Sequence, residues 1–196
     1  MLIAHERQMA VEIEIKLKVD HLAPVRDRLK ALGAQHVGEV IETNTFFDTP
    51  DRALLASDCG LRLRRSRNCV TKEEKLIATY KGPRGEGQVK KREEIEVAVD
   101  KAQPTEQLLE RLGYVRQLSF EKRRETWKLD KCTVELDALP ELGSYVEIEG
   151  ASESDVVKVR EKLGLAGAAA VVPTYADLVS HHLSDRGHRE TSLKFA

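Results

Sequence analysis

The chain has 196 residues, of which 41% are apolar and 33% are charged, and its 32 lysines and arginines nearly balance 33 aspartates and glutamates. This length suits one domain, or two small ones, with a real core. The balanced charge argues against a general role in coating nucleic acid or a membrane, so any anion-binding site must come from local sorting of charge.

The cysteine pattern and the lengths of the apolar runs indicate the cellular compartment of the protein. Cys59, Cys69 and Cys132 are widely spaced and form no CxxC pair, which argues against a disulfide framework or a thiolate zinc site and suits a reducing compartment. No apolar run approaches the roughly 20 residues that span a bilayer. Residues 1–10 lack the apolar core of a signal peptide and are expected to form a tail. We therefore expect a cytoplasmic protein with no membrane partner.

The first strand raises the question of what its charged side faces. Residues 11–20, VEIEIKLKVD, alternate apolar side chains with acids and bases, which is typical of a β-strand with one apolar and one charged face. Two environments are open for the charged face. It can face water, as in many antiparallel sheets, or it can line a polar tunnel whose outside is covered by helices.

A strand followed by a helix with a similar sequence pattern occurs three times along the chain. In each case a strand with an E-x-E pattern precedes a helix that ends in Leu-Gly. The strands are residues 11–16, 91–97 and 145–150, and the helices are residues 20–34, 101–114 and 152–165. We interpret this order as an internal repeat with unequal periods.

Runs rich in β-branched and aromatic residues predict the remaining strands. These runs cover residues 36–49, 60–67, 75–83, 118–130 and 131–150. A short helix is expected over 173–183, and the polar residues 184–196 are expected to fray. The sequence therefore predicts one α+β domain over residues 11–183, with about eight antiparallel strands in a barrel or curled sheet and helices after some of them.

Charges on these strands are grouped by sign. Acids recur as E-x-E pairs, as at Glu12 and Glu14, whereas bases recur as R-x-R or K-x-R pairs, as at Arg62 and Arg64. Two such residues lie on one strand face roughly 6.5–7 Å apart, where they repel unless an opposite charge sits between them. Solvation accounts for any single strand, but the joint pattern favours a site that holds a divalent cation together with phosphates.

The ligand types indicate which cation and which anion such a site would take. Oxygen ligands without cysteine or clustered histidine favour Mg²⁺ or Mn²⁺ over zinc. The Gly-rich segment 82–88, GPRGEGQ, lacks the Gly-Lys-Ser/Thr ending of a P-loop. Basic side chains would therefore hold the phosphates, and their number suits a polyanion such as a triphosphate.

Taken in chain order, these segments resemble the CYTH superfamily, the triphosphate tunnel metalloenzymes. The E-x-E-x-K of Glu12, Glu14 and Lys16 is similar to the opening signature of that family, and the resemblance extends over about residues 11–180. The other segments that carry it are NTFFDT, GLRLR, TYKGP, REEIEV, EKRRETW, VELDALPELGSYVEIE and PTYADLV. The resemblance implies an eight-stranded antiparallel β-tunnel with a charged interior and helices packed on the outside, so the charged face of residues 11–20 would line the tunnel.

The resemblance also implies roles for individual positions. The implied catalytic residues are Glu12, Glu14 and Lys16. The implied metal ligands are Glu12, Glu14, Asp137, Glu147 and Glu149. The implied triphosphate-binding bases are Lys16, Arg62, Arg64, Lys81, Arg92, Lys122 and Arg124. Four positions stay open. Asp137 can instead orient a neighbouring base, and Glu94 and Glu96 can mainly pair with tunnel arginines. Tyr175 can either plug a tunnel mouth or pack in the core.

The reactions of the family give the functional expectation. This chain is most similar to the class IV adenylyl cyclase-like group, on the stretch FFDTPDRALLASDCGLRLRR, the TYKGP turn and the PTYADLV end. The resemblance implies a Mg²⁺- or Mn²⁺-dependent conversion of ATP to cyclic AMP and pyrophosphate. Hydrolysis of thiamine triphosphate, tripolyphosphate or a nucleoside triphosphate is the alternative within the family.

A second alternative is a non-catalytic domain that binds polyphosphate or nucleic acid. The balanced charge, the 5% of aromatic residues and the acids that accompany the bases disfavour it, and nucleic acid is not expected as a partner. Homodimers occur in the family, and nothing in the sequence decides the oligomeric state.

Overall fold

The computed structural model of the chain describes residues 13–84, 92–185 and 191–196. The predicted site residue Glu12, the expected tail over residues 1–10 and residues 85–88 of the Gly-rich segment lie outside these described residues.

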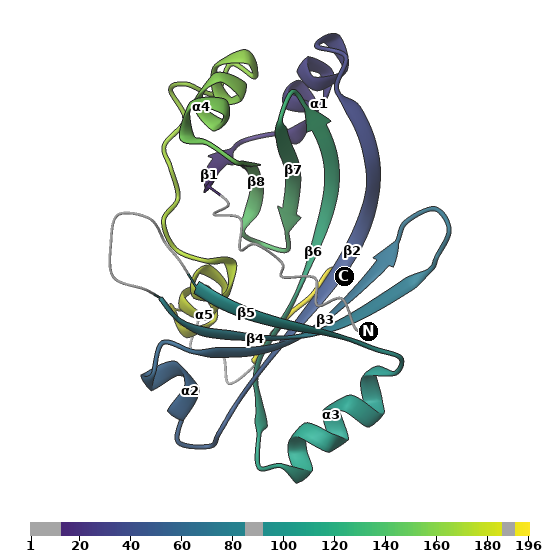
Figure 1. Ribbon diagram of the computed structural model, residues 1–196, viewed down its shortest axis with the longest axis vertical. Helices are drawn as coiled ribbons and strands as arrows, with labels where there is room; N and C mark the ends of the chain where they lie inside the picture. The colour runs from purple at the N-terminus through teal and green to yellow at the C-terminus, as the bar shows by residue number, and fades with distance from the viewer. Residues whose placement is uncertain (1–12, 85–91, 186–190) are drawn as a thin grey trace, which may run out of the picture.

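The described residues form five helices and nine strands (Figure 1). The helices are α1 (Leu22–Ala31), α2 (Ala53–Ala56), α3 (Ala102–Arg111), α4 (Glu153–Lys162) and α5 (Tyr175–Asp185). The strands are β1 (Ile13–Val19), β2 (Gln35–Asp48), β3 (Gly60–Asn68), β4 (Glu74–Arg84), β5 (Arg92–Val99), β6 (Val115–Leu129), β7 (Cys132–Leu139), β8 (Gly143–Gly150) and β9 (Ser192–Leu193). None of these helices combines the length and the apolar character that crossing a membrane requires.

All of these strands belong to one sheet. Eight of them follow the order β1-β8-β7-β6-β2-β3-β4-β5 with antiparallel pairing, which confirms the predicted α+β class and the eight antiparallel strands. Of the two expected forms, a barrel and a curled sheet, the described residues show the curled sheet, because β1 and β5 end the path without pairing to each other. An irregular segment after α4 lies along the edge of β1 instead, where Val171 N donates to Lys16 O at 2.8 Å.

The long strands β2 and β6 join two parts of the sheet (Figure 1). On one side of this pair lie β7, β8 and β1, accompanied by α1 and α4. On the other side lie β3, β4 and β5, with α2 and α3 nearby. The strand order therefore brings Glu14 of β1 next to the E-x-E pair of β8, although these strands are far apart in the sequence.

The apolar residues of the alternating strands form the main core on one side of the sheet. Leu17, Val146 and Ile148 are 0% exposed there, in a cluster with Leu29 of α1 and Val159 of α4. Burying each such side chain contributes about 1.5–3 kcal/mol. The expectation that helices cover the apolar face of the first strand is confirmed.

Helix α5 departs from the expectation that the helices pack on the outside. Its Tyr175 and Val179 pack against Phe120 and Tyr145, which lie on the same sheet face as the charged side chains. The physical reason is that this face changes character along β6: Phe120 is apolar, whereas Lys122, two residues later with the same orientation, is charged. The apolar end of the face is buried by α5.

The end of the chain is also more ordered than its polar composition suggests. Ser192–Leu193 forms β9, which pairs in parallel with Ser119 and Phe120 of β6. Leu193 is buried in the cluster beneath α5. The expected fraying is therefore wrong for these residues, because one apolar side chain and a free strand edge suffice to anchor them.

Asp48, at the end of β2, anchors the connection to β3. Its carboxylate accepts hydrogen bonds from the backbone N–H groups of Thr49 at 2.7 Å, Leu54 at 2.9 Å and Leu55 at 3.0 Å. Burial alone would raise the pKa of Asp48, but these hydrogen bonds outweigh it and lower the pKa below its ordinary value. The short helix α2 is thus held by a charged acceptor at its start.

We expect Asp48→Asn to lower the free energy of unfolding by about 1.5–3 kcal/mol at pH 7, because charge-assisted hydrogen bonds are lost. The pKa of Asp48 is depressed in the folded state, so its contribution is present above the unfolded pKa of about 3.9 and is lost as the pH falls through the folded value. Denaturant titrations from pH 7 to pH 2 should show the difference between wild type and variant shrinking below about pH 4. The exposed neighbour Asp51, changed to Asn, is the control, and a difference independent of pH would contradict the assignment.

Candidate functional site

One face of the sheet collects the charged side chains, and we call it the charged face. The registers of neighbouring strands place its members side by side: Lys16 is opposite Glu147, which is opposite Glu135, and Arg124 is opposite Asp137. From β1 through to β5 it comprises Glu14, Lys16, Glu149, Glu147, Glu135, Asp137, Lys122, Arg124, Glu42, Asn44, Arg62, Arg64, Thr79, Lys81, Glu94 and Glu96. The face expected to line a polar interior is thus continuous over eight strands.

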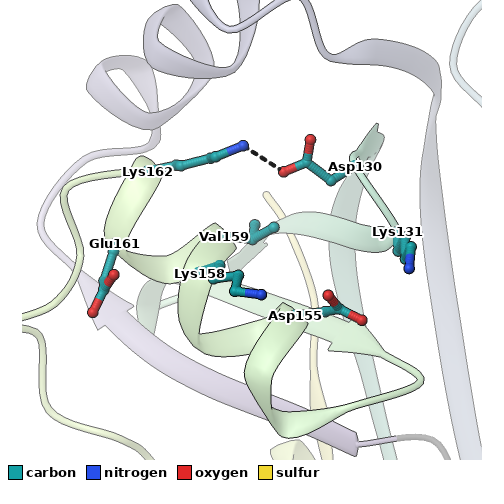
Figure 2. Close-up of a pocket in the computed structure, with 7 residues that line it drawn as sticks. All are labelled: Asp130, Lys131, Asp155, Lys158, Val159, Glu161 and Lys162. Carbon is teal, nitrogen blue, oxygen red and sulfur yellow. Dashed lines mark hydrogen bonds and ion pairs between the residues drawn. The ribbon is translucent and has the colours of Figure 1, made fainter.

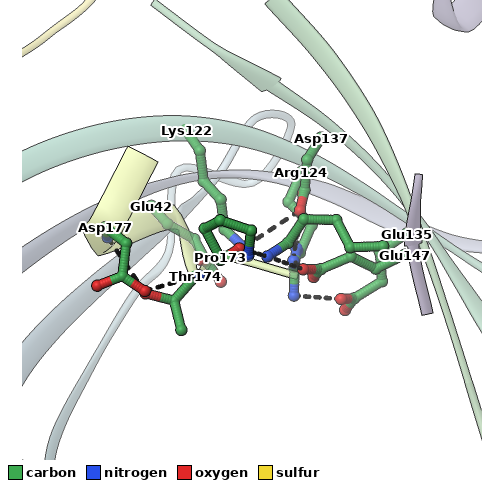
Figure 3. A network of polar contacts seen from close by, with 10 residues as sticks. Glu42, Lys122, Arg124, Glu135, Asp137, Glu147, Pro173, Thr174 and Asp177 are labelled. Atoms are coloured by element: carbon green, nitrogen blue, oxygen red, sulfur yellow. Dashed lines mark hydrogen bonds and ion pairs between the residues drawn. The ribbon is translucent and has the colours of Figure 1, made fainter. Parts of the chain in front are cut away.

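Arg124 lies at the centre of the acids on β7 and β8 (Figure 3). Its Nε donates to Asp137 Oδ1 at 2.7 Å, and one terminal nitrogen lies 2.5 Å from both Asp137 Oδ2 and Glu147 Oε2. The other terminal nitrogen contacts Glu135. One guanidinium therefore binds three carboxylates, the fork geometry that arginine offers and lysine does not.

Lys122 connects this cluster to β2. Its Nζ lies 3.3 Å from Asp137 Oδ2 and 3.4 Å from Glu42 Oε2, and the side chains of Lys122 and Asp137 are 3% and 0% exposed. Burial disfavours ionised carboxylates, but the adjacent Lys122 and Arg124 outweigh it and hold the pKa of Asp137 well below its usual range. The pKa of Glu42 is lowered by Lys122 and Arg64 in the same way.

Arg64 and Arg62 extend the basic part of the face onto β3. Arg64 Nε donates to Asn44 Oδ1 at 3.0 Å, and its terminal nitrogen lies 3.3 Å from Glu42. Arg62 has a weaker counter-ion, Glu96 at 3.9 Å, and donates to Thr79 Oγ1 at 3.2 Å. Burial and the neighbouring Arg64 lower the pKa of Arg62 to about 10, which leaves it a cation at neutral pH. Arg62 is therefore a buried positive charge with little compensation.

Lys16 and the start of α5 occupy the β1 end of the cluster. Lys16 Nζ donates to the carbonyl of Pro173 at 2.8 Å, lies 3.7 Å from Glu147 and sits over the ring of Tyr175, whose centroid is 4.4 Å away. The same ring lies 5.0 Å from Lys122 Nζ. Tyr175 therefore packs in the core, which is one of the two roles left open by the sequence, and its ring also covers two lysines of the charged face.

The remaining predicted residues lie further from this cluster. Glu14 and Glu149 are paired opposite each other, two residues along from Lys16 and Glu147. Lys81 lies towards the other end of the face, 2.6 Å from Glu94 on β5. Arg92 belongs to β5, but its side chain lies outside the described ones. The structure brings together the predicted residues Lys16, Lys122, Arg124, Asp137 and Glu147. Arg64 joins them through Glu42, which also contacts Lys122.

Four residues of the charged face, Glu135, Glu42, Asn44 and Thr79, were not predicted from the sequence. Glu135 precedes Asp137 by two residues, so the same i, i+2 spacing that identified the E-x-E pairs would have found it. Glu42 and Asn44 share a face of β2 but sit among threonines, and only the pairing of β2 with β6 reveals their charged neighbours.

The donor set fits a hard divalent cation in type. Asp137, Glu135 and Glu147 supply carboxylate oxygens, which Mg²⁺ and Mn²⁺ prefer. In the described part of the chain no three acids, histidines or cysteines are already spaced around a common cation position. The acids around Arg124 are instead spaced by its guanidinium, so a cation there would require these side chains to move.

A recess on the outer side of the sheet is chemically different. It has a volume of about 310 Å³ and lies between α4 and the turn from β6 to β7 (Figure 2). Its lysines alternate with acids, and Lys162 Nζ donates to Asp130 Oδ2 at 2.8 Å. The charged face, rather than this recess, is therefore the candidate site.

The protein has an α+β fold with a curled antiparallel sheet. One face of this sheet buries acids and bases that form a network of ion pairs. A sequence model of the CYTH domain matches residues 10–169, and the chain therefore belongs to the CYTH domain family. A protein of Methanocaldococcus jannaschii, provisionally named an adenylate cyclase, is 31% identical over 139 residues, which cover 71% of this chain and 76% of that protein.

Solved structures share the fold. The PH1819 protein of Pyrococcus horikoshii has a TM-score of 0.72 and 25% identity, over 87% of this chain and 99% of that one. A protein of Vibrio parahaemolyticus, provisionally named an adenylate cyclase, has a TM-score of 0.74 and 21% identity, over 88% and 99% of the two chains. A protein of Hippeastrum, provisionally named an adenylyl cyclase and described as revealing a dominant triphosphatase activity, has a TM-score of 0.62 and 22% identity, over 91% and 97%.

Lys122 offers a test of the buried charge network. We expect Lys122→Met to lower the free energy of unfolding by about 3–5 kcal/mol, because it leaves Asp137 and Glu42 without their shared cation. Adding Glu42→Gln should restore part of that loss, with a coupling of about 1–3 kcal/mol in a double-mutant cycle. Chemical denaturation measures all three variants, with Lys128→Met, an exposed lysine of the same strand, as the control. Additive losses would show that the two side chains do not interact energetically.

Proposed function

We propose that the charged face binds a triphosphate together with a divalent cation, and that the protein is an enzyme of the class IV adenylyl cyclase type, which converts ATP to cyclic AMP and pyrophosphate. Membership of the CYTH family and the name of the Methanocaldococcus jannaschii relative support this class. Hydrolysis of a triphosphate is the second candidate, because the Hippeastrum protein that shares the fold is described as a triphosphatase.

The observation that carries the proposal is a set of buried polar atoms on one face that make no hydrogen bond to the described residues. Nδ2 of Asn44 and Nε of Arg62 are unused donors, and Oε2 of Glu42 is an unused acceptor despite its ion pair with Lys122. A buried polar atom without a hydrogen bond costs about 1–3 kcal/mol. Three of them on one charged face support a polar ligand there, and the two N–H donors suit phosphate oxygens.

The two candidate reactions use the same bound substrate and differ in the attacking oxygen. In cyclisation the ribose 3′-hydroxyl attacks the α-phosphorus, whereas in hydrolysis water attacks, usually at the γ-phosphorus. A bound divalent cation would supply neutralisation of the phosphates and activation of the attacking oxygen. Arg62, Arg64 and Lys122 would hold the phosphate oxygens and stabilise the charge that develops on them.

Lys16 is our candidate for accepting a proton from the attacking group. Burial lowers its pKa, against the opposing influence of Glu147 and Glu14. A lysine with a lowered pKa loses its own proton more readily and can then act as a base. Its present hydrogen bond to Pro173 O would have to be given up for that role.

The first experiment follows ATP by phosphorus NMR at mildly alkaline pH, with Mn²⁺ and then with Mg²⁺. Pyrophosphate and a cyclic phosphodiester signal would support cyclisation. Orthophosphate and ADP would instead support the hydrolase, and thiamine triphosphate and tripolyphosphate would be tried next. If every triphosphate stays intact in the presence of either cation, the enzyme proposal is wrong and a non-catalytic polyphosphate-binding domain replaces it.

Glu147 provides the matching variant. We expect Glu147→Gln to reduce the rate of triphosphate turnover by at least about 100-fold, because the acid beside Lys16 and Arg124 loses its charge. Glu161→Gln, an exposed acid of α4 on the other side of the sheet, is the control and should retain the wild-type rate. Equal rates for the two variants would remove Glu147 from the site.

Arg62 tests the binding of the phosphates separately from turnover. We expect Arg62→Gln to weaken binding of inorganic tripolyphosphate at least about tenfold, because a charge-assisted contact is lost. The unfolding free energy without ligand should stay within about 1 kcal/mol of wild type, since the cation removed has little compensation. Calorimetric titration in EDTA measures the affinity. Arg67→Gln, on the same strand but exposed on the opposite face, is the control, and equal affinities for the two variants would contradict the assignment.

A further inference from the structure

Arg124 is bound to the acids of the site and not positioned as a free phosphate-binding base. Every nitrogen of its guanidinium contacts a carboxylate oxygen: Nε and one terminal nitrogen contact Asp137, that terminal nitrogen also contacts Glu147, and the other contacts Glu135. Its side chain is 11% exposed. The family resemblance implied that Arg124 binds triphosphate, yet each nitrogen of its guanidinium already contacts a carboxylate of the protein.

The carboxylates around Arg124 cannot be left without a cation. Three acids from adjacent strands meet there, and like charges this close in a buried site repel strongly. Glu135 and Glu147 lie opposite each other on β7 and β8, and both contact the guanidinium that also binds Asp137. The guanidinium therefore neutralises the cluster that a divalent cation would otherwise neutralise.

The other bases nearby do not serve the same three acids. Lys122 lies between Asp137 and Glu42, and Lys16 is held mainly by the carbonyl of Pro173, with Glu147 at 3.7 Å. Across the network, four bases face four acids, so the described cluster is internally neutral. The bases are Lys16, Arg64, Lys122 and Arg124, and the acids are Glu42, Glu135, Asp137 and Glu147. Adding a divalent cation without moving any of them would leave an excess of positive charge.

We propose that Arg124 is an internal counter-ion that competes with the divalent cation for the carboxylates of Asp137, Glu135 and Glu147. The inference rests on the proposed function, and it makes Arg124 a positioning residue whose contacts change when the site is loaded. A cation that binds these oxygens displaces the guanidinium, which can then turn to the oxygens of a phosphate, its other preferred bidentate partner. This reconciles the predicted role of Arg124 with its observed contacts.

Competition and a simple supporting role predict opposite effects of removing Arg124 on the affinity for the cation. If Arg124 only held the acids in place for the cation, removing it would weaken cation binding. If Arg124 competes with the cation, removing it strengthens cation binding, because the acids lose their internal partner and gain more from the added charge. The sign of the change therefore decides between the two.

The experiment measures Mn²⁺ binding to the full chain by electron paramagnetic resonance of the free ion, without any triphosphate. We expect Arg124→Gln to bind Mn²⁺ at least about tenfold more tightly than wild type, since a charge-assisted competitor is removed. The control is Arg123→Gln, because Arg123 is the adjacent arginine of β6, lies on the opposite face and is half exposed. It should bind Mn²⁺ as wild type does. Unchanged or weaker binding by Arg124→Gln would overturn the proposal.

Three further measurements cover loss of folding and failure of the proposed function. Arg124→Gln leaves three acids unbalanced, so Mn²⁺ should raise its thermal midpoint more than that of wild type, and an equal or smaller rise would count against the proposal. If Arg124→Gln does not fold, Arg124→Lys is used instead, because it keeps one charge but not the fork. It should bind Mn²⁺ at least about threefold more tightly than wild type, and no tightening would overturn the proposal.

Tripolyphosphate binding by wild type is measured in parallel. Its absence would count against the proposed function alone, whereas normal binding with unchanged Mn²⁺ affinity in the variant would count against the role of Arg124 alone.

Discussion

The ion pairs of Arg124 and Lys122 with Asp137 are the interactions on which the arrangement of this sheet depends. A fully buried aspartate is tolerated only when its partners are in place, and breaking such a pair costs several kcal/mol, about 3–5. Those partners come from β6, and the same bases also bind Glu147 on β8 and Glu42 on β2. The register of four neighbouring strands is therefore set by charge on one face as well as by apolar packing on the other.

The two faces of each strand were predictable because side-chain direction in a strand depends only on whether a position is odd or even. In β1 this rule places Leu17 against the helices and Lys16 on the charged face, as expected. Helix positions followed from apolar spacing and the Leu-Gly endings for the same local reason. The strand pattern could not give which strands are neighbours, so the contact of Lys16 with Glu147 was not predicted and comes from the pairing of β1 with β8.

The remaining differences between the sequence predictions and the structure have a common physical cause. Residues that are distant in the sequence determine the environment of a side chain. Asn44 is buried because β2 pairs with β6, and nothing in its own strand indicates this. Helix α5 crosses to the charged face because Phe120 and Tyr145 make one end of that face apolar. The bases of the site were identified by type, but Arg124 binds acids because three carboxylates meet at its position, a fact of topology and not of local sequence.

Strand order also separates the two kinds of charge across the face. Acids predominate on β7 and β8, whereas β3 contributes Arg62 and Arg64, and β6 lies between these groups with both Lys122 and Arg124. A cation bound with a triphosphate has the same asymmetry, because the cation seeks carboxylates and the phosphates seek guanidinium groups. Under the proposed function, β6 would thus be the boundary at which a base can exchange an acid for a phosphate. Arg124 is placed to make that exchange because its fork reaches carboxylates on both acidic strands, β7 and β8, whereas Lys122 contacts only one of them, through Asp137, together with Glu42 of β2.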